Sequence, residues 1–595
     1  MVRRSEGSLE QLWRAEELMT EGKVDAARSL INALEGVDDL PPDAFLTWKL
    51  LKSQLLIIMG DLEASHQLAA QLRQTSLDRG QLLQGVDGSI AMAEALVELG
   101  DLEASANAIA EGEQLLTAVA DEAPAVLSQR KASFIYLRGR ICLYKAESDK
   151  AMDYFQQSLA LRQELGNKHD IAISLRNIGV VHGYKGSLDQ ALEYHQQALK
   201  LFQEVGNKAR IAICLTNIGG YLQGKGELDP ALEHCQQGLA LFQEIGSNSS
   251  VAYSLGILAG IHHAKGELDC ALDHYQQKLT IVEELGNKWS LADCLFDIGW
   301  LDWHRGELDR ALEHFQHALA LGQELDNKFF IANTLGSIGL IHWQKGALEQ
   351  ALLHLEDDLR YHEKLDHNIQ VGFCLFWLIL VSLDLGSSEQ AQQYLKQLQH
   401  INEQEDHKGL SQVSRLAQAL TLKASLRIRD KAKAQELFQQ LVEEEVVHFL
   451  ATKLAMINLC ELLLDELKAY GEVGVFQEAK SLVDKLYAFA QTQHSFSLVI
   501  NALILKAKFA MVEGDLAVAA QYLEQAKVTA DEKGLGRLAE IVSAEKQQLG
   551  AQYAIWEQLI QRNASFRERV EQARINDYLK DIEKLVSPQS LELPS

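Results

Sequence analysis

Proline is scarce in this sequence, with only 6 residues in 595. Four of them, Pro41, Pro42, Pro124 and Pro230, fall at or just before the start of an expected helix, where a missing N–H removes no hydrogen bond. None falls inside an expected helix. An apolar content of 47% with 23% charged residues is typical of a folded chain rather than a disordered one. These features predict a chain that is almost entirely helical.

Basic residues are also few, because 56 lysines and arginines face 83 acidic residues and leave a net charge of -27. That charge opposes binding to nucleic acid or to an anionic membrane surface, so we expect no nucleic-acid partner. The longest apolar run, Phe373 to Val381, is about half of a membrane span. The start, MVRRSEG, lacks the apolar segment of a secretory signal. We expect a soluble cytoplasmic protein without membrane insertion, and the sequence leaves its oligomeric state open.

The seven cysteines form no CxxC pair and follow no pairing rhythm, which indicates a reducing compartment. Three of them, Cys214, Cys294 and Cys374, share one repeated position with serine and threonine in other copies, so we expect them to be small packing residues.

The motifs of several enzyme and ion-binding classes are missing, including GxxxxGK[ST], GxSxG, HExxH and the EF-hand loop. His234, His274, His314 and His354 do recur at one position of successive repeats. Neighbouring helical hairpins lie about 10 Å apart, whereas ligands of one zinc ion each lie within about 2.1 Å of it. We therefore interpret these histidines as packing residues, and expect no metal, no cofactor and no catalysis.

A 40-residue period is present from Asn167 to about Asp366. Six glycines and six alanines keep this interval: Gly186, Gly226, Gly266, Gly306, Gly346 and Gly386, each followed five residues later by Ala191, Ala231, Ala271, Ala311, Ala351 and Ala391. A second series, Gly166, Gly206, Gly246 and Gly286, marks another turn. Self-similarity at this period is the signature of a solenoid, in which each unit buries its apolar face against its neighbours.

Apolar residues within each unit recur at helical spacing on both sides of the Gly186-type turn, which predicts a helical hairpin. With weaker matches outside the array we expect about thirteen hairpins. Gly179 and its equivalents fall in the middle of the first helix, and we expect them to face Ala191 and its equivalents at a close helix contact. From Gly534 onward we expect one long capping helix to about Leu585, and a frayed tail. The predicted organisation is divergent hairpins in 1–124, a regular array in 125–407, divergent hairpins in 408–535, and the cap and tail in 536–595.

The repeat unit resembles the tetratricopeptide repeat (TPR) at seven positions across five consecutive copies. The residues that carry the resemblance are Leu175, Asn177, Ile178, Gly179, Gly186, Ala191, His195 and Ala198. The unit length and the ELGNK-type loop look most like the subclass found in LGN/Pins adaptors, kinesin light chains and prokaryotic signalling proteins. The resemblance implies an all-α, right-handed superhelical solenoid whose first helices line a concave groove for a peptide or a helix of a partner.

If first helices line a groove, the positions of Arg176 and Asn177 and their equivalents face it. The candidate partner-binding residues are therefore Arg176, Asn177, Asn217, Gln223, Phe296, Asp297, Trp300, Trp303, Trp343, Phe373, Phe376 and Trp377. By resemblance, the asparagines would hydrogen-bond a peptide backbone. The rings, with Gly256, Gly260 and Gly336 leaving space beside them, would form a pocket for an anchor side chain. The alternative is that the rings fill gaps between neighbouring first helices, and intact folding of a Trp300→Ala, Trp343→Ala variant would favour the pocket.

Two functions fit these features. The first is a non-enzymatic scaffold or adaptor that binds a segment of another protein, possibly a basic one, since acidic residues such as Glu307, Asp309 and Glu313 would steer it. The second is a regulatory protein whose superhelix changes shape when a peptide or small molecule binds.

Overall fold

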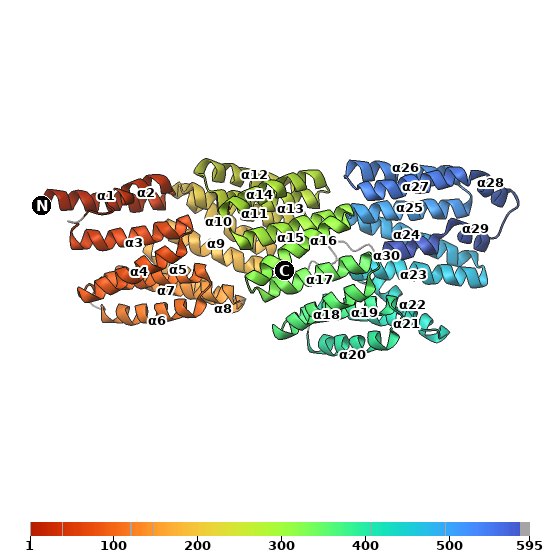
Figure 1. Ribbon diagram of the computed structural model, residues 1–595, viewed down its shortest axis with the longest axis horizontal. Coiled ribbons are helices and arrows are strands. Elements are labelled where there is room, and N and C mark those ends of the chain that lie inside the picture. Colours follow the sequence, from red (N-terminus) through yellow and green to blue (C-terminus); the bar gives the residue numbers. More distant parts are fainter. Residues whose placement is uncertain are drawn as a thin grey trace. The chain divides into compact units, whose positions relative to one another are not determined.

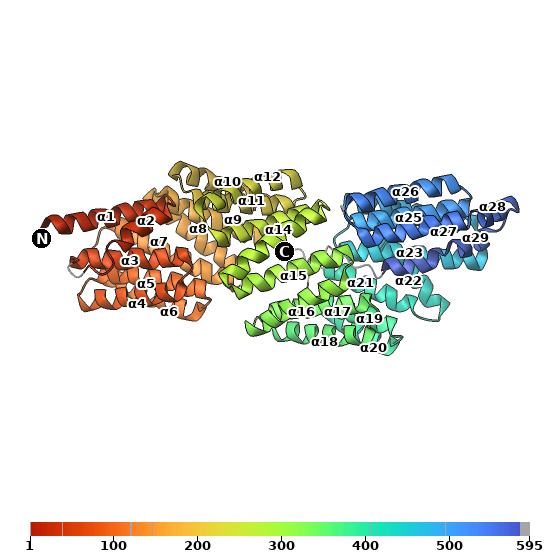
Figure 2. The same ribbon diagram turned by 45° about the horizontal axis from the view of Figure 1, so that its top comes forward.

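The computed structural model describes residues 2–37, 40–119, 122–145, 147–405, 407–493 and 495–583. Every regular element in these residues is a helix, and none is long and apolar enough to cross a membrane. The chain divides into two compact units, one up to Leu258 and one from Ala259 onward. Figures 1 and 2 show the helices of both units paired in sequence order. The division falls within α13, inside the regular array that the sequence predicted as one segment.

Thirteen helical hairpins follow one another in the described residues, as the period predicted. In the first unit they are formed by α1 (Val2–Thr20), α2 (Val24–Asn32), α3 (Pro42–Met59), α4 (Leu62–Asp78), α5 (Leu82–Leu99), α6 (Leu102–Ala118), α7 (Pro124–Tyr144), α8 (Ser148–Leu165), α9 (Lys168–Tyr184), α10 (Leu188–Val205), α11 (Lys208–Gly224) and α12 (Leu228–Ile245). The remaining hairpins are formed by α13 (Asn248–Ala264), α14 (Leu268–Leu285), α15 (Lys288–Arg305), α16 (Leu308–Glu324), α17 (Lys328–Gln344), α18 (Leu348–Lys364), α19 (Asn368–Asp384), α20 (Ser388–Gln404), α21 (Lys408–Lys423), α22 (Ile428–Glu443), α23 (Phe449–Tyr470), α24 (Val473–Thr492), α25 (Phe496–Glu513) and α26 (Leu516–Glu532).

The repeated loop residues explain where the helices begin and end. Asn207 caps α11, because its side-chain oxygen accepts a hydrogen bond from the Arg210 backbone N–H at 3.0 Å, and Asn287 caps α15 in the same way. Gly186 has a φ of 71°, a left-handed conformation that glycine adopts without steric strain. Two later copies place Asp326 and Asp366 in that conformation at the other turn. The sequence therefore defines both turns of the hairpin locally.

The glycines inside the first helices mark a close helix contact, as predicted, although their neighbour differs from the prediction. A Cβ on Gly219 would lie 2.1 Å from the Cys235 sulfur and 2.9 Å from the Ala231 carbonyl oxygen. At Gly299 the nearest atoms belong to the Phe315 ring. The glycine therefore packs against the side chain four residues after the repeated alanine, and only the alanine's carbonyl oxygen comes near it.

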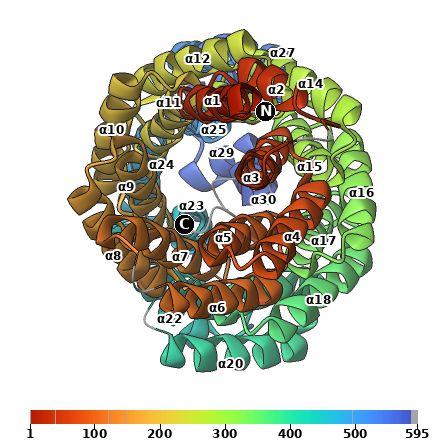
Figure 3. The same cartoon turned by 90° about the vertical axis from the view of Figure 1, so that its left-hand side faces the viewer.

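First helices lie on the inner side of the curve within each unit. In Figure 3, α3, α5, α7 and α9 lie inside α4, α6, α8 and α10. Consecutive first helices such as α3 and α5, α5 and α7, or α19 and α21 contact each other directly, whereas no consecutive pair of second helices in the described residues makes more than marginal contact. Elements that approach one another more closely occupy the shorter, inner path, so first helices form the inner face of each unit.

The carboxyl-terminal segment differs from the single capping helix that the sequence predicted. It consists of α27 (Gly536–Ala551), α28 (Tyr553–Gln561), α29 (Phe566–Ala573) and α30 (Ile575–Glu583). Asn563 and Arg574 have φ values of 52° and 51°, so the backbone turns at both residues and cannot continue as one helix. The expected frayed tail, SPQSLELPS, lies outside the described residues.

Candidate binding faces

The inner side of the first unit carries a cluster that we call the tyrosine–arginine face, consisting of Tyr136, Arg176, Asn177, Arg210, Tyr221 and Tyr253. The Asn177 amide donates hydrogen bonds to the Ile173 carbonyl at 2.8 Å and to the Tyr136 hydroxyl at 3.2 Å. Asn177 is only 5% exposed. Its amide nitrogen is therefore already engaged within the chain.

Tyr253 extends this face across the next hairpins. Its hydroxyl donates to the Asn217 side-chain oxygen at 3.1 Å, and the Asn217 amide in turn lies 3.2 Å from Nε2 of the buried His195. Tyr253 is 52% exposed, yet desolvation raises its pKa. A side chain that is open to water but poor in surrounding solvent lies on a recessed surface. Tyr184, 64% exposed, is close enough to Tyr253 and Tyr221 to raise the pKa of both.

The second unit gathers one predicted aromatic group into a continuous cluster. Phe296 lies between the rings of Phe315 and Phe330, with centroid distances of 5.3 and 5.6 Å. Trp300 stacks on Trp303 at 4.7 Å with an interplanar angle of 22°. Phe296 and Trp300 are partly exposed, whereas Trp303 is 3% exposed. This cluster joins α15 to its own second helix and to the next hairpin, and leaves two ring edges at the surface.

Other predicted rings are buried in the contact between successive first helices. Trp343, Phe376 and Trp377 are 2%, 1% and 4% exposed. The Trp343 and Trp377 rings lie 6.0 Å apart, and Trp343 Nε1 donates to an Asp384 carboxylate oxygen at 2.8 Å. Trp303 Nε1 makes the corresponding bond to Gln344 at 2.5 Å. Both indoles thus link one hairpin to the next, and a partner cannot reach these rings in this conformation.

The remaining predicted residues lie apart from one another. Phe373 stacks on His448 at 5.3 Å, and Gln223 is partly exposed on α11. The Asp297 carboxylate lies 3.1 Å from the Lys278 ammonium, which also bonds Asp293 at 2.8 Å. Desolvation raises the pKa of Asp297, although Lys278 opposes that shift. Asp297 therefore belongs to a recessed charge cluster within the fold.

Two groups in the second unit combine side chains of the kinds that bind metal ions. Asp358, His362 and Cys374 are all buried; the Cys374 thiol donates to Asp358 at 3.2 Å, and His362 Nε2 lies 3.2 Å from the other carboxylate oxygen. A Cβ on Gly336 would lie 2.7 Å from this carboxylate, so Asp358 fills the space that the sequence predicted to be open beside the rings.

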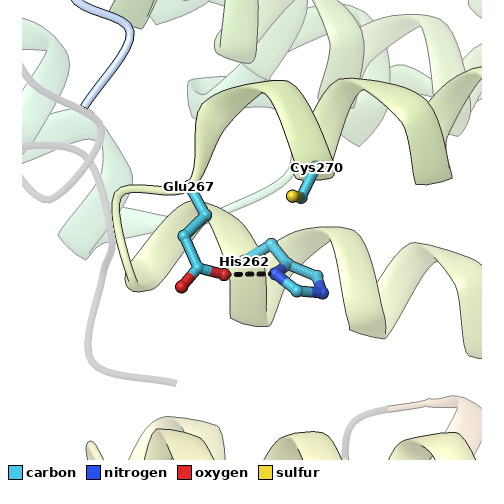
Figure 4. A group of neighbouring side chains, drawn as sticks. All are labelled: His262, Glu267 and Cys270. Carbon is cyan, nitrogen blue, oxygen red and sulfur yellow. Dashed lines mark hydrogen bonds and ion pairs between the residues drawn. The ribbon is translucent and has the colours of Figure 1, made fainter. Parts of the chain in front are cut away.

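The other group lies at the turn between α13 and α14 (Figure 4). His262 Nδ1 lies 2.6 Å from a Glu267 carboxylate oxygen, and the Cys270 sulfur is within 4.8 Å of the other two ligand atoms. The His262 ring stacks on His274 at 5.2 Å. Equivalent stacking of His182 on Tyr194 and of His342 on His354 shows that this ring pair is a repeated packing feature, as predicted for the second-helix histidines.

The inner face of the last hairpins is covered by the chain itself. Helices α29 and α30 contact the first helices α23 and α25, and Figure 3 shows both lying on the inner side. Tyr578 on α30 donates to Asn501 at 2.7 Å, and Asn458 donates to Glu583 at 3.1 Å. Asn458 occupies the same position in its helix as Asn177 does in α9. The position expected to bind a partner therefore binds an internal helix here.

Sequence reasoning missed Arg210, Tyr136 and Tyr221. Tyr253 was accessible to it, because Tyr253 occupies the repeat position of Ile173, one of those expected to face inward. Arg210 lies in the first turn of α11, at a position that holds aspartate, serine or phenylalanine in other copies. Nothing in the period marks that position as inward-facing, so only the folded arrangement reveals its place.

The repeated hairpins define an all-α solenoid of tetratricopeptide type. The chain belongs to the family described as the MalT-like TPR region, whose model matches residues 126–294 and 295–539. No curated protein sequence matches significantly. Subclass membership among long-unit TPR proteins stays a prediction.

Among solved structures, the chain is similar to a Rap protein complexed with competence and sporulation factor, with 16% identity over 65% of this chain and 100% of that chain and a TM-score of 0.42. It is similar to the apo form of the quorum sensor NprR from B. thuringiensis, with 14% identity over 59% and 97% of the two chains and a TM-score of 0.44. A STAND protein with a TPR sensor from Pyrococcus horikoshii is 12% identical over 56% and 52%, with a TM-score of 0.44.

Proposed function

We propose that this chain is a non-enzymatic interaction protein that binds a segment of a partner protein on the tyrosine–arginine face. The observation that carries the proposal is the composition of this recessed surface. Tyrosine and arginine dominate the energetically important positions of protein interfaces, because they combine large contact area with directional hydrogen bonds. Tyr253 and Tyr184 offer that area, being 52% and 64% exposed.

The second unit supports a smaller role for the predicted aromatic residues. Phe296, Trp300 and Phe373 are partly exposed and remain candidates for partner contact, whereas the buried tryptophans link neighbouring hairpins. The acidic residues expected to steer a basic partner are partly neutralised, since Glu307 pairs with Arg310 and Asp309 pairs with Lys345. Long-range steering of a basic partner then depends on the net charge of -27 rather than on these residues.

A photo-crosslinking amino acid at Tyr253, compared with one at the exposed Gln196 on second helix α10, tests this proposal in extracts of the native host. We expect one defined partner to cross-link from position 253 and not from position 196. Cross-links from the outer position alone would contradict the proposal. The regulatory alternative predicts in addition that solution scattering shows contraction or extension of the chain when the captured partner segment is added, whereas a static scaffold keeps its profile.

A further inference from the structure

Arginines on the inner side of the first unit differ in whether they have partners. Most are paired: Arg130 bonds Asp87 at 2.7 Å, Arg140 lies 2.9 Å from Glu98, and Arg162 bonds the Asp170 carbonyl and the Ser174 hydroxyl at 3.0 Å each. Each of these positive charges is balanced by an acceptor within the chain. A further pair on two successive first helices departs from that pattern.

The exceptions are Arg176 on α9 and Arg210 on α11. The described residues provide no hydrogen bond or ion pair to the Arg210 guanidinium. Arg176 makes one long contact, 3.4 Å, to the oxygen of its neighbour Asn177, and its buried Nε has no partner. Both side chains are half-buried.

These two charges are also close enough to repel each other. Desolvation, and secondly the charge of Arg176, lower the pKa of Arg210. Glu94 on α5 lies within electrostatic range of Arg210 but forms no ion pair with it in the described residues. An arginine stays protonated in such surroundings, so the fold keeps two neighbouring, poorly solvated positive charges without an acceptor. An unpaired charge of this kind is destabilising, and an anionic ligand would remove the penalty.

We propose that Arg176 and Arg210 form a carboxylate-binding site that anchors the partner segment on the tyrosine–arginine face. The inference rests on the proposed function and specifies its ligand chemistry. The planar guanidinium donates two parallel hydrogen bonds to a carboxylate, a geometry that the lysine ammonium does not reproduce. The neighbouring Tyr253 and Tyr221 rings supply contact area for the rest of the segment. The carboxylate is that of a peptide, either an aspartate or glutamate side chain or a free carboxyl terminus.

The test uses the full chain, immobilised, and three pools of randomised hexapeptides read out by mass spectrometry. One pool has a free carboxyl terminus and no acidic residue, the second is the same pool amidated, and the third is amidated with one aspartate. We expect at least about tenfold preferential retention of a carboxylate-bearing pool, the effect of about 1.4 kcal/mol. Preference for the first pool assigns the terminal carboxylate, and preference for the third assigns the side chain.

Substitution locates the effect. Arg210→Gln and Arg176→Gln should abolish the preference, whereas Arg28→Gln on second helix α2 should preserve it. Because Arg210 has no partner to lose, Arg210→Gln should melt at or above the parent temperature; Arg210→Lys, with its charge retained, should show an intermediate preference. Equal retention of amidated and free pools would overturn the carboxylate site while leaving the proposed function intact. Retention of no peptide would overturn both.

Discussion

At the scale of single residues, Trp343 shows how the structure changes an expectation drawn from the repeat pattern. The pattern places its indole on an inward-facing position, and the structure buries it between α17 and the next hairpin. Burial converts a candidate binding residue into a link between repeats. The predicted tolerance of a Trp343→Ala substitution is therefore replaced by its opposite.

Trp343→Ala should lower the free energy of unfolding by about 3–5 kcal/mol, because it leaves a large cavity between hairpins. Trp343→Phe retains most of the apolar volume and loses the hydrogen bond to Asp384, so we expect a loss of about 1–3 kcal/mol. Urea unfolding followed by circular dichroism measures both. Unchanged stability of the alanine variant would show that this ring is not a packing element.

Lys278 permits a second test at this scale. Its ammonium is 6% exposed and bonds Asp293 and Asp297, so Lys278→Met leaves two carboxylates close together. We expect a loss of about 3–5 kcal/mol at pH 7. Desolvation already raises the pKa of Asp297, and removal of Lys278 raises it further. The loss should therefore shrink as pH falls and Asp297 becomes neutral, and adding Asp297→Asn should restore much of the stability; a pH-independent loss would argue for packing alone.

At the scale of the helical hairpin, the decisive feature is the contact made by the glycine within each first helix. Gly219 and Gly220 are adjacent in α11 but meet different surroundings. A Cβ on Gly219 would overlap the Cys235 sulfur and the Ala231 carbonyl, whereas a Cβ on Gly220 would meet only Ile257 at 3.9 Å. The two positions are a matched pair in the same helical conformation.

Gly219→Ala should destabilise the chain by about 1–3 kcal/mol through overpacking. Gly220→Ala should instead stabilise it by up to about 1 kcal/mol, because alanine favours the helix and nothing is displaced. Thermal melts of the two variants beside the parent check the difference in sign. Equal effects of the two substitutions would contradict the close contact between α11 and α12.

At the scale of the whole molecule, buried histidines connect stability to pH. Burial lowers the pKa of His195 and of His448 to about 4, from an ordinary value of 6.5. Their folded pKa lies below the unfolded one, so the unfolded state binds protons first on acidification. Their stabilising contribution is complete above about pH 6.5 and is lost as pH falls toward about 4.

Each fully buried histidine should therefore lower the free energy of unfolding by about 2 kcal/mol between pH 7 and pH 5. Urea unfolding across this range measures the slope. His195→Gln should reduce that slope, because glutamine takes up no proton, while the exposed His234→Gln should leave it unchanged. Parallel curves for the parent and His195→Gln would show that His195 does not titrate in this way.

The sequence by itself determined the helical hairpins and their number, because both turns depend on local residues: a capping asparagine, a glycine in the left-handed conformation and a fixed apolar spacing. It also placed the small residues of the packing contact, including Cys214, Cys294 and Cys374, which are buried and free. Where the period ended it failed, since the breaks at Asn563 and Arg574 follow no repeated signal.

Only the tertiary structure decided which inward-facing positions stay open. The same repeat position holds Trp343, buried by the next hairpin, and Gln223, partly exposed on α11, because openness depends on the side chains that neighbouring hairpins present. Likewise, Arg162 and Arg210 are both arginines of this unit, and only their folded surroundings give one its acceptors and leave the other without any. Local spacing fixes an architecture, whereas contacts between distant residues determine which of its surfaces remain available for binding.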